Sequence, residues 1–221
     1  IRLTGTVDET RFHFQKLRLQ STLTTRLGEA SLQIRDEITN LAGTPAQAQL
    51  LYHINLGQPL LDPGSSLVAP VKTVVPRSEH AAHSIATWPS YPNELAGDPE
   101  RVYFCELYAD GDGMTQVLLK NAHGTQGFSL GFSTRQLPCF SVWKNTPTAV
   151  DGYVTGLEPA TNFPNSRSFE KHHDRVLELP PGGSASFSLT LAAHGTAAEV
   201  AQAEASVRTL QTGPAEVFDR P

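Results

Sequence analysis

Residues 17–27 read LRLQSTLTTRL, and this stretch shows the pattern that decides the fold class. Its leucines share one parity, while arginine, glutamine and threonine residues occupy the other. Because the side chains of a β-strand alternate between its two faces, a period of two predicts a half-buried strand. Residues 31–39 repeat the pattern with three aliphatic side chains facing inward, after a turn around Gly28.

The same period continues along most of the chain. After a loop with the breakers Gly43 and Pro45, residues 46–56 form the next expected strand. Further strands are expected at 101–108, 115–121, 127–134, 139–144, 151–158, 174–179 and 185–193. Many strands joined by short turns rich in Pro and Gly predict an all-β antiparallel sandwich.

One segment predicts a helix. Residues 197–211 are rich in Ala and Glu, with apolar side chains falling on one side. Thr196 and Glu199 have the spacing of a capping box, and Gly213 followed by Pro214 ends the helix. We therefore expect one β-sandwich domain over residues 1–221 with a single C-terminal helix.

The charge balance excludes several partners. The chain has 17 Lys+Arg against 22 Asp+Glu, a net charge of −5, whereas proteins that bind nucleic acid or anionic membranes usually carry a basic excess. It has no apolar run of about 18 residues, so we expect no membrane span. Charged residues make up 18%, below the usual ~25%, and Ser, Thr, Gln and Asn replace them. That composition is common in β-rich proteins that handle neutral polar ligands.

The chain opens at Ile1 directly on an alternating segment and holds a single Met, at position 114. We therefore expect it to be the C-terminal portion of a longer protein. We also expect a cytoplasmic location. Cys105 and Cys139 lack the spacing of a metal site. A disulfide between them and two free thiols both stay open.

Two segments hold the candidate chemistry. In the first, LYHINLG at 51–57, His53 and Asn55 share one strand face, and a His there could donate a proton near neutral pH. In the second, GLEPATNFPN at 156–165, we expect a strand to end at Glu158 because Pro159 breaks the pattern. A carboxylate at a strand end is a candidate general base. The alternative is a surface His and a turn-initiating Glu.

Together, the two segments resemble motifs of the aldose 1-epimerase (galactose mutarotase) superfamily. Members carry a strand reading approximately N-H-x-Y-F-N-L and, later, L-E-T-x-N-Y-P-D. Here the first appears as YHINL at 52–56, with a shorter gap between His and Asn, and the second as LEPATNFPN at 157–165, with a longer gap between Glu and Asn. Within the superfamily, the two motifs are most similar to those of the DUF4432-type branch, and the resemblance extends over residues 15–193.

The resemblance implies a galactose mutarotase-like β-supersandwich that binds an aldose in an open cleft. In the family, a Glu removes the proton of the anomeric hydroxyl and a His protonates the ring oxygen, which places Glu158 as base and His53 as acid. No metal or other cofactor is implied. A second active-site His is also implied on a strand that precedes this chain, within roughly a hundred further residues.

Other residues are candidate substrate contacts. Trp143 could stack on a sugar face, and Lys144 could bind hydroxyls or a carboxylate; a core Trp and an exposed Lys are the alternative. Glu106 is the best match for a family acidic ligand, and Arg167 could contact an anionic substituent, although both also fit ordinary surface residues. The remaining substrate-binding candidates are Asn55 and Asn162. His172 and His173 do not form a metal site if they alternate on a strand.

Two hypotheses follow. The first is a mutarotase-like isomerase, for which His53 and Glu158 should face one cleft with room for a pyranose ring between them. The second, motivated by the altered motif spacing, is a carbohydrate-binding or sensing module without turnover. The sequence leaves open the sugar and whether the protein forms a homodimer.

Overall fold

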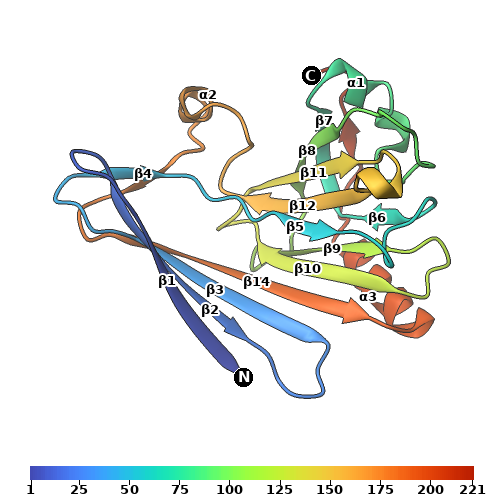
Figure 1. The fold of residues 1–221 in the computed structure, drawn as a ribbon, viewed down its shortest axis with the longest axis horizontal. Helices are drawn as coiled ribbons and strands as arrows, with labels where there is room; N and C mark the ends of the chain where they lie inside the picture. The colour runs from blue at the N-terminus through green and yellow to red at the C-terminus, as the bar shows by residue number, and fades with distance from the viewer.

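The computed structural model describes residues 1–221 and confirms the prediction of an all-β fold (Figure 1). The larger sheet has seven strands in the order β1-β2-β3-β14-β10-β9-β6. Their bounds are β1 Arg2–Thr10, β2 Lys16–Thr24, β3 Ser31–Asn40, β6 Ser66–Val68, β9 Met114–Lys120, β10 Gly127–Ser133 and β14 Ser184–His194. Every pairing in this sheet is antiparallel.

The second sheet has six strands in the order β15-β7-β8-β11-β12-β5. Their bounds are β5 Ile54–Leu56, β7 Val71–Pro76, β8 Arg101–Leu107, β11 Cys139–Asn145, β12 Val154–Ala160 and β15 Glu216–Val217. A separate two-stranded ribbon joins β4 (Ala46–Ala48) to β13 (Leu177–Leu179). The pairing of β15 with β7 is parallel.

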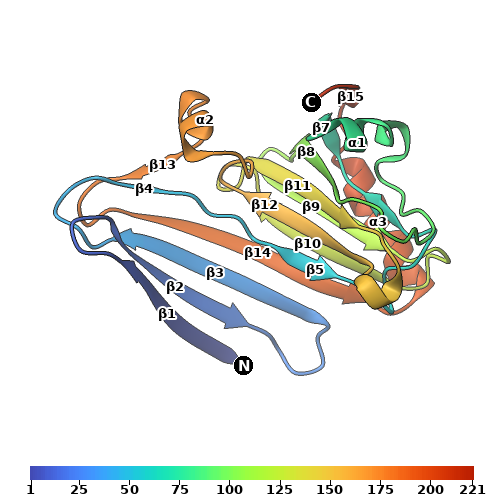
Figure 2. The same cartoon turned by 45° about the horizontal axis from the view of Figure 1, so that its top comes forward.

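The core lies between the two sheets. Phe132 of β10 stacks on Phe140 of β11 across the sandwich, with ring centroids 5.9 Å apart. Strands β1 to β3 extend beyond the region that the six-stranded sheet covers, as both views show (Figure 2). All nine residues of β1 are consequently exposed, including the apolar Leu3 and Val7.

The predicted helix forms as α3, Ala197–Thr209, with the expected capping box between Thr196 and Glu199. Its buried stripe of Val200, Ala203 and Val207 packs on Leu118 at the outer face of the larger sheet. The expectation of a single helix is wrong. The structure adds two short helices, α1 Glu79–Ala82 and α2 Arg167–His172, and 3₁₀ turns at Ile85–Thr87 and Ala149–Asp151.

Serine N-caps explain both added helices. The side chain of Ser78 accepts a hydrogen bond from the first turn of α1, and Ser166 does the same for α2. Helices of four and six residues are too short to show a helical period in the sequence. His172 and His173 therefore lie at a helix end rather than on a strand. No helix of the protein is long and apolar enough to cross a membrane.

Residues 46–56 are not one strand. The segment divides because its ends belong to different sheets: β4 pairs with β13, whereas β5 pairs with β12. Between them the chain crosses from the ribbon to the six-stranded sheet and makes one isolated β-bridge, from Leu51 to Ala160 of β12. This crossing brings His53 beside β12.

Pro159 does not end its strand, contrary to the prediction. Its missing N–H faces Tyr52 on the segment before β5, so the proline leaves the pairing of β12 with β11 intact and interrupts only the pairing on the β5 side. Its carbonyl still accepts a hydrogen bond from the backbone N–H of Tyr52, at 3.1 Å. Glu158 thus lies inside the strand, two residues before its end.

Cys105 and Cys139 are both free and buried. They lie on the adjacent strands β8 and β11, but Cys105 pairs in register with Phe140, so the two thiols point to opposite faces of the sheet. Burial raises the pKa of both thiols. These are inert core cysteines.

Candidate active site

His53 and Glu158 lie in direct contact on the open face of the six-stranded sheet. The imidazole Nε2 is 3.0 Å from Oε1 of the carboxyl group. The pairing of β5 with β12, which sets Asn55 opposite Gly156, brings together residues more than a hundred positions apart. Asn55 lies two residues after His53 on the same face, and its side chain is exposed.

This contact leaves no room for a pyranose ring between the two groups, which differs from the arrangement expected of a mutarotase. The reason is Gly156, which lies between them. A Cβ added at this position would lie 2.7 Å from Oε1 of Glu158 and 2.8 Å from Cε1 of His53. The absence of a side chain at 156 is what lets the imidazole and the carboxyl group touch.

The two partners differ in their access to water. The side chain of Glu158 is only 5% exposed, whereas that of His53 is 44% exposed. Burial and, to a smaller extent, the charge of Glu100 raise the pKa of Glu158 to about 7, while Arg77 opposes the shift. A carboxyl group with this pKa is half ionised near neutral pH, as a general base requires.

Trp143 forms one wall beside the pair. It faces Gly156 across the β11–β12 ladder, and its ring meets that of His53 edge-on with centroids 5.5 Å apart. Its indole N–H donates to Glu100 at 2.7 Å. Arg77 lies 3.8 Å from the same carboxylate. These contacts fix the indole next to the acid–base pair and hold near Glu158 the two charges that affect its pKa.

A hollow of about 350 Å³ continues along the same face over β7 and β8. Phe104 and Phe163, stacked with centroids 4.7 Å apart, line it together with Arg77 and Glu106. Glu106 is exposed at its rim, 3.5 Å from Lys72. Glu106 can contact a ligand bound in the hollow, but its strand β8 is two strands away from β12, which carries Glu158.

Three other expected contacts lie elsewhere. Lys144 follows Trp143 on β11 and therefore points to the opposite, covered face of the sheet, where it is buried. Arg167 opens α2 and reaches Gln49, at 3.3 Å, away from the pair. Asn162 is buried in the turn after β12, where its amide donates to the carbonyl of Phe163. The structure brings none of them to His53.

Two further buried polar residues were not expected from the sequence, one beside the pair and one next to the hollow. Ser141 stands opposite Glu158 in the β11–β12 register and is fully buried, yet its hydroxyl has no hydrogen-bond partner. Glu170 of α2 is also fully buried and accepts hydrogen bonds from the backbone of Phe163, from Asn165 and from Arg175. A Ser in a strand and a Glu in a short helix carry no sequence signal, since their roles depend on the residues that the fold places around them.

Glu170 therefore holds the loop that carries Phe163. We expect Glu170→Ala to lower the free energy of unfolding by about 3 kcal/mol, because it leaves the Arg175 guanidinium half-buried without its carboxylate. Urea denaturation measures the change. Glu178→Gln is the matched control. Glu178 is exposed and its ion pair with Lys171 is long, at 3.8 Å, so this substitution should change the free energy of unfolding little. Equal effects of the two substitutions would show that the buried pair has no special role.

Comparison with known proteins places the chain in a family. The model of the family described as "Domain of unknown function (DUF4432)" matches residues 1–193. The crystal structure of a "putative aldose 1-epimerase" from Klebsiella pneumoniae is 33% identical, with a TM-score of 0.97. The alignment covers 100% of this chain and 58% of that chain, so this chain spans little more than half the length of its relative.

More distant structures share the fold alone. A "putative aldose 1-epimerase" from Escherichia coli K12 is 16% identical with a TM-score of 0.60, over 88% of this chain and 65% of that chain. A galactose mutarotase related enzyme from Lactobacillus acidophilus is 14% identical with a TM-score of 0.60, over 88% and 68%. None of the curated proteins matches. The chain therefore belongs to the DUF4432 family and has the galactose mutarotase-like fold.

Proposed function

We propose that the protein is an aldose 1-epimerase-like isomerase that interconverts the anomers of a sugar, with Glu158 as base and His53 as acid. One observation carries the proposal: a buried carboxyl group and a half-exposed imidazole, 3.0 Å apart, on an open sheet face. The 33% identity to the Klebsiella protein supports the reaction class. The activity, substrate and partners of the whole protein are part of the proposal.

The short separation suits the two oxygens that react. The anomeric hydroxyl and the ring oxygen are bonded to the same carbon, so an acid and a base in contact with each other can reach both from one side of the sugar. The ring then lies across the pair, with one edge toward Trp143, rather than between the two groups. Trp143 offers a flat apolar wall for the sugar carbons.

The proton transfers balance without a cofactor. Glu158 takes the proton of the anomeric hydroxyl, whose oxygen becomes the aldehyde oxygen as the bond from the anomeric carbon to the ring oxygen breaks. His53 gives its proton to the ring oxygen. After rotation of the aldehyde, the same steps in reverse close the ring on the other face, so both groups return to their starting states.

Exchange NMR of equilibrated sugars tests the proposal. The protein should accelerate anomer interconversion of at least one member of a panel that includes neutral, acidic and phosphorylated aldoses, above the buffer rate. Binding of a sugar without acceleration of its interconversion would instead support a carbohydrate-binding module. If no sugar binds or reacts, both functions are wrong.

The pH profile of the reaction gives a second expected result. Because turnover needs Glu158 ionised and His53 protonated at the same time, the rate should follow a bell-shaped pH profile. Its rising limb, which reports the ionisation of Glu158, should have a midpoint near 7. Glu100 raises the pKa of Glu158, so Glu100→Gln should move the midpoint to lower pH. Arg77→Gln should move it to higher pH, because Arg77 lowers that pKa. Initial rates measured between pH 5 and 9 provide the test, and identical midpoints in all three proteins would contradict it.

A further inference from the structure

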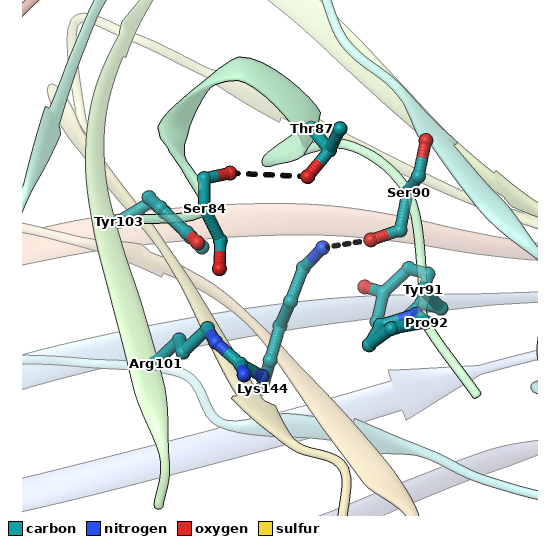
Figure 3. Close-up of a pocket in the computed structure, with 8 residues that line it drawn as sticks. All are labelled: Ser84, Thr87, Ser90, Tyr91, Pro92, Arg101, Tyr103 and Lys144. Carbon is teal, nitrogen blue, oxygen red and sulfur yellow. Dashed lines mark hydrogen bonds between the residues drawn. The ribbon is translucent and has the colours of Figure 1, made fainter. Parts of the chain in front are cut away.

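A second cavity has a volume of about 290 Å³ (Figure 3). It lies on the opposite face of the six-stranded sheet from Glu158, because Lys144 and Trp143 alternate on β11. The segment from Ser84 to Pro92 covers it, and Arg101, Tyr103 and Lys144 of the sheet form its floor. Figure 3 shows the amine of Lys144 reaching into the middle of the lining side chains. Nothing in the proposed isomerisation uses this cavity.

Lys144 is the most unusual residue of the cavity, since it is only 2% exposed. Its amine donates to the carbonyl oxygens of Trp88 and of Ser90, the latter at 2.8 Å. It also lies 4.1 Å from the centre of the Tyr91 ring. These contacts occupy its N–H groups, but all three partners are neutral, so no carboxylate balances the charge of the ammonium group.

A second cation stands directly beside it. Arg101 pairs with Lys144 in the β8–β11 register, so the two side chains are cross-strand neighbours on the same face. Like charges in this position destabilise a sheet. Asp98 neutralises Arg101 through two hydrogen bonds, at 2.7 and 2.8 Å, which leaves one positive charge in excess. The Nε of Arg101 is buried and has no hydrogen-bond partner.

We propose that this cavity binds a small oxyanion, such as phosphate or the carboxylate of a small metabolite, beside Lys144 and Arg101. The anion supplies the negative charge that the protein itself lacks there. The hydroxyl-bearing residues Ser84, Thr87 and Ser90 line the cavity and can donate hydrogen bonds to oxyanion oxygens. The two named ligands share this chemistry, and their affinities distinguish them.

Binding is linked to a proton on Lys144. Burial, and then the charge of Arg101, lower the pKa of Lys144 to about 7. The other ionisable groups that face it stay neutral at this pH, because burial raises the pKa of Tyr91, of Tyr103 and of Cys105. An anion favours the charged amine, so binding at pH 8 should take up a proton, and affinity should fall as pH rises above 7.

Isothermal titration calorimetry of the purified protein with sodium phosphate, and separately with sodium acetate, tests the proposal. At least one anion should bind in the wild type, with a heat that varies between buffers of different ionisation enthalpy by the amount expected for proton uptake. A purely structural lysine would give no such dependence. The tighter of the two anions identifies the kind of ligand.

Two substitutions test whether the anion binds in this cavity. Lys144→Met should weaken binding at least about tenfold and abolish the proton uptake. Thr87→Glu, at the exposed rim, should weaken it comparably by placing a carboxylate at the mouth without touching the buried amine. Lys72→Met, an exposed lysine on β7, is the matched control and should bind as the wild type does. Absence of binding by both anions, or equal affinity in all four proteins, would overturn the proposal.

Discussion

Glu158→Gln should lower the rate of anomer interconversion by about 10²- to 10⁴-fold on the sugar that the wild type converts best. The amide has nearly the same shape as the carboxyl group and can keep a hydrogen bond to His53, but it cannot accept the proton of the anomeric hydroxyl. The loss should therefore appear in kcat, with the affinity for the sugar nearly unchanged. Exchange NMR at saturating and at low sugar concentration separates the two quantities.

Two controls accompany this substitution. Glu37→Gln changes an exposed glutamate of β3 in the other sheet and should leave the rate unchanged. Stability gives an independent readout. Because folding raises the pKa of Glu158 from 4.5 to about 7, the wild type loses stability as pH rises between these two values, and the loss is complete above pH 7. Glu158→Gln should therefore be the more stable protein at pH 9 and show no such advantage at pH 4. Equal rates for wild type and Glu158→Gln would show that this carboxyl group is not the base.

Gly156→Ala should reduce the same rate by about 100-fold while leaving the protein folded. Its new methyl group would lie 2.7 Å from the Glu158 carboxyl oxygen and 2.8 Å from the His53 ring, far inside van der Waals contact. The cheapest relief is to move one of these side chains, which separates the acid from the base. Sub-ångström displacement of reacting groups is costly because proton transfer needs both at hydrogen-bond distance.

Gly131→Ala is the matched control for this prediction. Gly131 also lies inside a strand, β10, but a Cβ there would meet its nearest neighbour, the carbonyl oxygen of Thr115, at an ordinary 3.7 Å. Thermal unfolding and exchange NMR of both variants separate local crowding of the pair from a general effect of alanine on a strand. Wild-type activity in Gly156→Ala would mean that the contact between His53 and Glu158 is not needed for turnover.

Alternation of side chains was sufficient to predict most strands. The prediction of a strand at 31–39 matches β3 because inward aliphatic residues alternate with outward polar residues. Only Asp36 interrupts the inward face, where it is buried and accepts a hydrogen bond from the hydroxyl of Tyr52. The capping box at Thr196 likewise marked the start of α3, since its two hydrogen bonds are local. Prediction failed where the determinant is a neighbour distant in sequence: the division of 46–56 depends on two different partner strands.

The same distinction between local and distant determinants applies to the candidate site. Local alternation along the chain was enough to predict the all-β fold. The resemblance of two motifs to the aldose 1-epimerase superfamily, rather than their spacing alone, singled out His53 and Glu158. Only the tertiary structure decided that the two residues touch, that Gly156 makes room for the contact, and that Trp143 lies beside it while Lys144 lies behind the sheet. The physical reason is that register between strands is set by packing across the sheet, which spacing along one strand does not encode.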